Sequence, residues 1–223
     1  MKIIIINGSP RTNGLTATLL RGIENRLLEK GAEVQYYDLG KLNMAHCAGC
    51  CNCYATGHCH INDDATMLSE MISDADGLVL GSPTYASNVS GPMKVLIDRG
   101  HFVIEQLLTD KQCVTVTSGE NYGSRDANKV LNRLVLYSGG NLADKIVINA
   151  PFNGVSSVSD KVDKLSRRSA DKLYSSISKK KRNLFQKAFH SIVLNTGIKP
   201  LVKKKGPKYQ GVIDKWKELG IYG

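Results

Sequence analysis

No stretch of this sequence is apolar for roughly eighteen or more consecutive residues, the length that a helix needs to cross a membrane. The apolar start at residues 2–6 is too short for the hydrophobic core of a signal peptide, and it leads directly into the turn residues Asn7 and Gly8. We therefore expect a protein without a membrane span and with a cytoplasmic location.

Cysteine is nearly absent outside one segment. Of the six cysteines in 223 residues, five lie in the pattern Cys47-x2-Cys50-x2-Cys53-x5-Cys59, with Cys51 next to the second of them. Thiols clustered in this way serve metals or catalysis in a reducing compartment rather than disulfides. Structural zinc fits the segment poorly, because it usually takes two cysteine pairs separated by about a dozen residues or more.

Two common phosphate-binding signatures are missing from the loop after residues 2–6. No Gly-Lys-Ser/Thr follows it, as in a P-loop, and its glycines do not have the G-x-G-x-x-G spacing. The loop offers instead a set of hydroxyl, guanidinium, amide and backbone N–H groups at the start of a predicted helix, where anions bind well. These groups belong to Ser9, Arg11, Thr12, Asn13, Gly14, Leu15 and Thr16. A cradle for a terminal monophosphate and an ordinary β–α loop capped by Asn13 both fit this composition.

Apolar, β-branched runs alternate with segments of helical period along most of the chain. Strands are expected at residues 2–6, 33–39, 77–81, 112–117 and 142–149, and helices at 15–30, 65–73, 91–108, 124–137 and 160–177. Such alternation predicts an α/β fold, a flavodoxin-like doubly wound five-stranded parallel sheet of order 2-1-3-4-5. Its ligand is expected at the carboxyl ends of strands one and three. Residues 43–64 read as a long cysteine-rich loop between two elements.

Positive charge is concentrated after residue 160, where 17 Lys and Arg face four Asp and Glu, whereas residues 1–160 carry a net charge of −3. Residues 184–193 show an apolar stripe at helical spacing, Pro200 is expected to end that helix, and residues 212–219 form a last short helix with Trp216. We expect residues 1–180 to form the flavodoxin-like domain and residues 181–223 a basic helical extension.

The lysine-rich extension leaves several roles open. It carries no recognised nucleic-acid motif, so we expect no nucleic-acid partner. The helix can pack on its own body or on a second subunit, bind an anionic membrane surface, or steer an acidic electron donor such as ferredoxin.

Three loops in order resemble those of the NADPH-dependent FMN reductase family, over roughly residues 1–180. Gly8-Ser-Pro-Arg-x-x-Gly14-x-Thr16 resembles its FMN-phosphate loop, Gly81-Ser-Pro-Thr-Tyr85 resembles its second flavin loop, and Thr117-Ser-Gly119 resembles the loop that closes the other side. The following Asp98-Arg99 is interpreted as a structural pair on a helix. The resemblance implies that residues 1–180 bind FMN. The implied contacts are Ser9, Arg11, Asn13, Gly14, Leu15, Thr16, Pro83, Thr84, Tyr85, Asn88, Thr117, Ser118 and Gly119.

The cysteine segment resembles the compact motif of the iron–sulfur flavoproteins, a branch of the same family. The resemblance implies a 4Fe–4S cluster beside the FMN, with Cys47, Cys50, Cys53 and Cys59 as ligands and Cys51 as an extra thiol. Spacings of two residues let one loop present three thiolates, and Gly57 allows the chain to turn back for the fourth. Cluster-free relatives resemble this chain too, so a plain loop stays open. The loop histidines His46, His58 and His60 are expected to be solvated.

The resemblance implies an FMN-dependent oxidoreductase that moves electrons between ferredoxin or NAD(P)H and a small acceptor through FMN and a 4Fe–4S cluster. It also implies a homodimer or homotetramer with FMN near a subunit interface. We assign no catalytic side chain, because the protein positions and tunes such cofactors. The alternatives are a cluster-free NAD(P)H-dependent FMN, quinone, nitro or azo reductase, a flavin-fold electron carrier, and a polyanion-binding adaptor.

Overall fold

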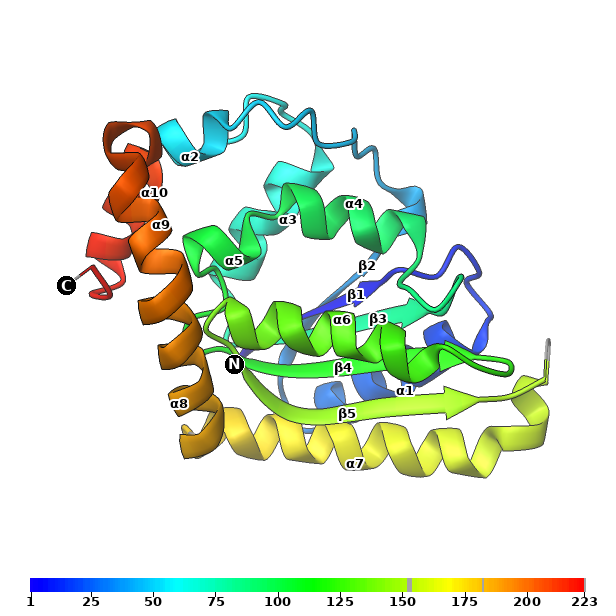
Figure 1. Ribbon diagram of the computed structural model, residues 1–223. Coiled ribbons are helices and arrows are strands. Elements are labelled where there is room, and N and C mark those ends of the chain that lie inside the picture. Colours follow the sequence, from blue (N-terminus) through cyan, green and yellow to red (C-terminus); the bar gives the residue numbers. More distant parts are fainter. Residues whose placement is uncertain (152–153, 182, 223) are drawn as a thin grey trace.

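The computed structural model describes residues 1–151, 154–181 and 183–222. Its centre is one sheet of five parallel strands in the order β2-β1-β3-β4-β5, which confirms the predicted topology (Figure 1). The strands are β1 (Lys2–Asn7), β2 (Glu33–Asp38), β3 (Gly77–Pro83), β4 (Gln112–Gly119) and β5 (Asn141–Asn149).

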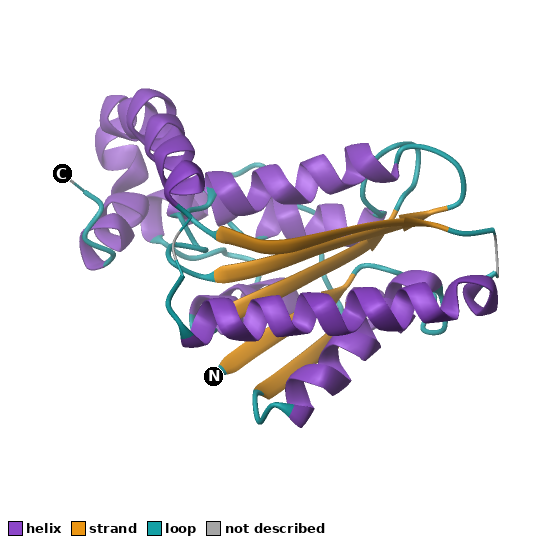
Figure 2. Ribbon diagram, turned by 90° about the horizontal axis from the view of Figure 1, so that it is seen from below, coloured by secondary structure: helices purple, strands orange, loops and turns teal. Residues whose placement is uncertain are grey.

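Helices cover both faces of the sheet, as Figure 2 shows. The helices are α1 (Leu15–Glu29), α2 (Asn52–Thr56), α3 (Asp64–Ser73), α4 (Gly91–Arg99), α5 (Phe102–Glu105), α6 (Ser124–Tyr137), α7 (Ser159–Ser178), α8 (Leu184–Val193), α9 (Lys199–Lys205) and α10 (Gln210–Glu218). Successive side chains of a strand point to opposite faces. Ile3 and Ile5 accordingly pack with α1 and α7, whereas Ile4 and Ile6 pack with α3, α4 and α6. This arrangement explains why β1 is apolar throughout.

The single helix expected over residues 91–108 is wrong: the chain breaks after Arg99 and restarts as α5. Gly100 ends α4, and His101 adopts a left-handed φ of 52°. The break turns the chain so that Phe102 is buried. A Cβ at position 100 would lie only 2.2 Å from a carbon of the Phe102 ring. Only glycine therefore fits at position 100 in this conformation.

The cysteine segment is not loop throughout, because α2 forms within it. Cys51 precedes α2 at a φ of 59°, and Gly57 ends it at a φ of 79°. The turn expected at Gly57 is thus present, in the left-handed region that favours glycine.

Pro200 does not end the helical stretch that begins at Leu184, contrary to expectation. A π-helical turn at Leu194–Ile198 follows α8, and α9 continues from Lys199 with Pro200 in its first turn. The π-helical turn, in which the Lys199 N–H donates to the Leu194 carbonyl five residues back, lets the proline, which has no N–H, enter the helix. The last predicted helix is confirmed as α10, in which Trp216 is fully buried.

The three C-terminal helices lie at one end of the molecule (Figure 1). Their own apolar cluster, formed around Trp216, Val202 and Val212, packs on Val103 and Ile104 of α5 and on Tyr54 of α2. The extension therefore contacts the cysteine segment directly. None of the helices in the described ranges is long and apolar enough to pass through a membrane.

Candidate flavin and iron–sulfur sites

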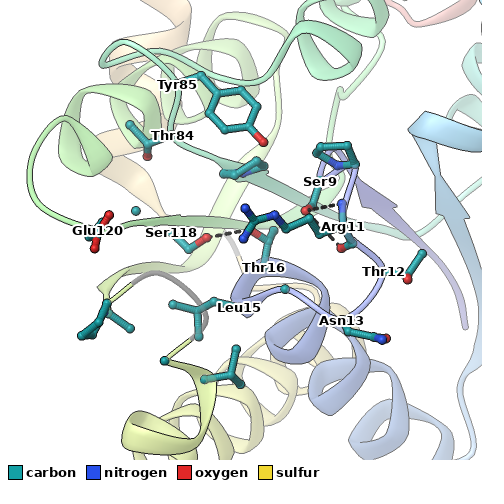
Figure 3. A pocket seen from close by; sticks show the side chains of 18 of the residues that line it. Ser9, Arg11, Thr12, Asn13, Leu15, Thr16, Thr84, Tyr85, Ser118 and Glu120 are labelled. Carbon is teal, nitrogen blue, oxygen red and sulfur yellow. Dashed lines mark hydrogen bonds between the residues drawn. The ribbon is translucent and has the colours of Figure 1, made fainter.

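A cleft of about 780 Å³ opens at the carboxyl ends of β1, β3, β4 and β5, the edge where open α/β sheets bind ligands. Its size is within the range of small-molecule and cofactor pockets. Figure 3 shows its labelled side chains. It is lined by Ser9, Pro10, Arg11, Thr12, Asn13, Gly14, Leu15, Thr16, Pro83, Thr84, Tyr85, Ser118, Gly119, Glu120, Ala150, Pro151, Gly154, Val155 and Ser156.

The loop between β1 and α1 forms one wall and is held by its own hydrogen bonds. The Ser9 hydroxyl accepts from the Arg11 N–H at 3.1 Å, and the Ser9 N–H donates to Asn7 Oδ1 at 3.0 Å. Gly14 is the residue that precedes α1, and no side chain of the described chain caps the helix there. The Asn13 cap of the ordinary-loop alternative is therefore absent. The first N–H groups of α1 remain directed at the cleft, where they favour an anion.

The opposite wall is the loop after β3, closed by a tight turn. Tyr85 and Asn88 exchange backbone hydrogen bonds of 2.9 and 3.0 Å, with Ala86 and Ser87 between them at φ values of 49° and 60°. Such left-handed conformations in non-glycine residues cost free energy and cluster at functional sites. The turn leaves the Tyr85 ring half exposed above the cleft (Figure 3).

A buried hydroxyl on this wall has no partner. Thr84 Oγ1 is buried and makes no hydrogen bond within the described chain, although the Thr84 N–H donates to Ser118 O at 2.7 Å. An unsatisfied buried hydroxyl is costly and indicates a missing partner. At the floor, Thr16 and Ser118 share a hydrogen bond of 2.6 Å. The uncapped helix, the Arg11 guanidinium and this hydroxyl together fit a phosphorylated, heteroatom-rich cofactor such as FMN.

Eleven of the thirteen residues expected at the flavin site line the cleft, and Asn88 and Thr117 do not. The Asn88 side chain is exposed and accepts from the Val89 N–H at 2.8 Å. Thr117 is fully buried and donates to the Ser124 carbonyl at 2.9 Å. Our prediction did not include the wall after β5, to which Ala150, Pro151, Gly154, Val155 and Ser156 contribute. The signal was available, because the carboxyl end of β5 lies at the same edge as those of its neighbours.

The five clustered thiols lie outside this cleft. Cys47, Cys50 and Cys51 are exposed, whereas Cys53 and Cys59 are half-buried. Burial first, and then Glu105 and Cys59, raise the pKa of Cys53 to about 11. Cys50 Sγ lies 3.3 Å from His60 Nδ1, so His60 contacts a thiol instead of being only solvated. The remaining cysteine, Cys113, is fully buried in the core, and burial raises its pKa to about 12.

No three His, Cys, Asp or Glu side chains of the described ranges converge on a point that would hold a metal ion. The donor set itself fits an iron–sulfur cluster, because four soft thiols lie in thirteen residues and metal binding deprotonates such groups.

Both ends of the cysteine segment are fastened to α4 by one buried ion pair. Arg99, which we interpreted from sequence as structural, pairs with Asp63 through bonds of 2.9 and 2.8 Å. The same guanidinium donates to the Ala45 and Ile61 carbonyls at 2.7 and 3.1 Å. The segment thus begins and ends at a single side chain.

The middle of the segment is covered by the C-terminal extension. The Tyr54 ring of α2 stacks on Tyr209 with centroids 4.8 Å apart. A Cβ on Gly211 would lie 2.0 Å from the Gly57 backbone nitrogen, so α10 and the segment touch backbone to backbone. Lys215 pairs with the buried Glu105. These contacts pack the extension against α2, the helix that contains Cys53.

Comparison with known proteins agrees with a flavin site in this cleft. The sequence profile of the NADPH-dependent FMN reductase family matches residues 1–152. The chain belongs to this family. An iron-sulfur flavoprotein of Clostridioides difficile (strain 630) is 36% identical over 99% of this chain and 100% of its own length. The members of this family and the relative's name together indicate a flavin oxidoreductase.

More distant matches cover less of the molecule. An iron-sulfur flavoprotein of Methanocaldococcus jannaschii is 40% identical over 44% of this chain and 51% of its own length. Among solved structures, a flavone reductase (TM-score 0.63, 19% identity, 82% of this chain and 66% of its own) and RosB with a bound riboflavin-phosphate intermediate (TM-score 0.66, 14% identity, 80% and 79%) share the fold. These structures agree with the flavodoxin-like fold of this chain.

Proposed function

We propose that this protein is an FMN-dependent, electron-transferring iron–sulfur flavoprotein. It moves electrons between a reduced donor, ferredoxin or NAD(P)H, and a small acceptor. The observation that carries the proposal is the four-thiol segment fastened to α4 and covered by the extension, in a chain similar along 99% of its length to a protein named an iron-sulfur flavoprotein.

FMN is held by the residues of the cleft. Arg11, the Ser9 and Thr16 hydroxyls and the first N–H groups of α1 bind its phosphate, because charge-assisted and backbone hydrogen bonds suit a dianion. Thr84, Ser118 and Gly119 supply polar contacts to the ring, and the Tyr85 ring covers one of its faces. Bound FMN accepts two electrons or a hydride and can pass electrons on singly.

Cys47, Cys50, Cys53 and Cys59 hold a 4Fe–4S cluster, which supplies one-electron transfer. Helix α4 connects the two sites. The flavin loop after β3 leads into its first residue, and its last residue, Arg99, lies beneath the cysteine segment. Nine helical residues span about 13 Å. This separation is one reason to propose a homodimer or homotetramer, in which a second subunit brings its flavin to the segment.

The exposed face of α8 supports such an assembly. Phe185 is 90% exposed and Leu184 77% exposed, with Ile192 on the same helix at 61%. We expect a Phe185→Glu variant to sediment as a smaller species than the unaltered protein in analytical ultracentrifugation. Equal masses for the Phe185→Glu variant and the unaltered protein would place the interface elsewhere.

The decisive test is the iron and acid-labile sulfide content per FMN of protein purified without oxygen. About four of each per FMN is expected for one cubane cluster. FMN without iron would assign the protein to the cluster-free NAD(P)H-dependent reductases, which the separated thiols of the described chain favour. Protein that binds no FMN would overturn the proposal as a whole.

A further inference from the structure

Arg99 is a fully buried charged side chain beneath the cysteine segment, with 2% of its surface exposed. Four of its hydrogen bonds leave from Nη1 and Nη2, to the two carboxylate oxygens of Asp63 and to the carbonyls of Ala45 and Ile61. Through these bonds the guanidinium holds both ends of the cysteine segment. One of its five N–H groups is not used by them.

That group is Nε, which is buried and has no hydrogen-bond partner in the described part of the chain. A buried donor on a charged group without an acceptor is costly and rarely left so. Asp63 cannot serve it, because the carboxylate already accepts from both Nη atoms and from the Ala45 and Ala65 N–H groups. The missing acceptor must come from another side.

Cys59 is the acceptor at hand. It is half-buried and stands two residues before Ile61, whose carbonyl accepts from Arg99 Nη2 at 3.1 Å. A ligand thiolate keeps lone pairs that accept N–H bonds. Cys59 is also the cysteine nearest in sequence to Ile61 and Asp63, which Arg99 binds.

We propose that Arg99 Nε donates a hydrogen bond to the sulfur of Cys59 when that sulfur ligates the cluster, and that Arg99 thereby sets the cluster's reduction potential. Arg99 is a positioning residue, and the inference rests on the proposed cluster. Reduction adds one electron from the donor and no proton, so the cluster becomes more negative. A fixed cation and an N–H···S bond stabilise the reduced form more than the oxidised form, which raises the potential.

The test is an anaerobic spectroelectrochemical titration of the cluster in three variants. Arg99→Gln removes the positive charge, and Arg99→Lys keeps the charge but lacks the planar guanidinium group. Lys94→Gln removes an exposed cation from the same helix, where Lys94 pairs with Asp98. We expect the cluster potential to become more negative in Arg99→Gln, to shift partway in Arg99→Lys, and to stay unchanged in Lys94→Gln. The FMN potential is an internal control that stays constant in all three.

A second measurement uses the unaltered protein and so does not depend on the variants folding. Protein grown with ¹⁵N-arginine is reduced, and pulsed EPR detects nitrogen coupled to the paramagnetic cluster. A ¹⁵N coupling is expected, and it disappears in Arg99→Lys if that variant loads a cluster. Iron in the wild type without this coupling, or with variant potentials unmoved, would overturn this inference alone. No iron in the wild type would overturn the proposed function and this inference with it.

Discussion

Single buried polar atoms mark both proposed cofactor sites. Thr84 Oγ1 and Arg99 Nε are each buried without a hydrogen-bond partner in the described chain, one in the cleft and one beneath the cysteine segment. Folding alone gives neither atom an acceptor or donor, so both are costs that a ligand can offset. Both atoms therefore support the proposed cofactor sites, although Tyr36, Glu105 and Ser138 also carry a buried atom of this kind.

At the phosphate end of the cleft, Arg11→Gln tests whether the loop binds the phosphate of FMN. Losing one charge-assisted hydrogen bond of about 1.5–3 kcal/mol weakens FMN binding roughly 10- to 100-fold. Riboflavin lacks the phosphate, so its affinity is expected to stay the same. Fluorescence titration of apoprotein with both flavins measures this. An equal loss for the two flavins would show that Arg11 contacts the ring or shapes the loop instead.

At the scale of elements, two contacts hold the helices on the sheet and the extension on the body. α7 is fastened to β5 through Asp144, which accepts from Ser169 at 2.7 Å, Lys172 at 3.0 Å and Arg168 at 2.9 Å. α10 is fastened to the cysteine segment through the Gly211–Gly57 approach and the buried Trp216, whose Nε1 donates to Ile104 O at 2.9 Å. The first contact stabilises the flavin domain, and the second shapes the segment.

We expect Asp144→Asn to lower the free energy of unfolding by about 1–2 kcal/mol at pH 7, since its partners are half exposed and screened. Burial raises the pKa of Asp144, but Ser169, Lys172 and Arg168 lower it further, so the net pKa lies below its usual value. A depressed carboxyl pKa contributes stability above the unfolded pKa, and that stability is lost as the pH falls through the folded pKa. Urea unfolding at several pH values should therefore show the two proteins converging below about pH 4. A constant difference down to pH 2 would contradict this account.

Gly211→Ala tests whether α10 shapes the cysteine segment. The added Cβ overlaps the Gly57 backbone, which is expected to cost about 1–3 kcal/mol of unfolding free energy and to move α10 off Cys53. Alkylation of Cys53 in metal-free protein, followed by mass spectrometry, should then be faster. The matched control is Gly197→Ala in the same extension, where a Cβ meets no atom within 4 Å. Equal rates of Cys53 alkylation in the two variants would show that α10 does not shape the cysteine segment.

Over the whole molecule, charge is divided between the body and the extension. Residues 1–160 carry a net charge of −3, whereas the lysines of α9 and its neighbours lie exposed beside α2 and the cysteine segment (Figure 1). A positive surface next to a redox centre raises the encounter rate of a negatively charged partner. If the proposed function holds, we expect an acidic electron donor such as ferredoxin to dock at this end.

Replacing Lys203, Lys204 and Lys205 together by glutamine is expected to slow reduction by ferredoxin at low ionic strength. The difference should fade as salt screens the charges over a Debye length of about 8 Å or less. Stopped-flow kinetics across a salt series measures both effects. The matched control makes the same charge change at the exposed Lys129, Lys161 and Lys164 of α6 and α7. Equal rates for the lysine variant and the control at low salt would exclude docking at α9.

The sequence by itself determined the parts of this protein that depend on local periodicity and on loop chemistry. β-Branched runs such as residues 3–6 predicted strands buried on both faces. The β–α alternation predicted a doubly wound sheet, and right-handed crossovers together with the chain length favoured the strand order 2-1-3-4-5, which the structure has. Eleven of the thirteen residues that the family resemblance implies for the flavin site line the cleft, because the carboxyl ends of parallel strands meet at one edge.

Tertiary structure decided what depends on contacts between distant residues. The break after Arg99 arises from the Phe102 ring packing against Gly100, and Pro200 is accommodated by the π-helical turn ahead of it. Thr117 turns away from the cleft because its hydroxyl finds the Ser124 carbonyl. Arg99 binds residues 36 to 54 positions away, a distance in sequence at which no local pattern carries a signal. The fastening of both ends of the cysteine segment by Arg99 is therefore decided by the tertiary structure alone.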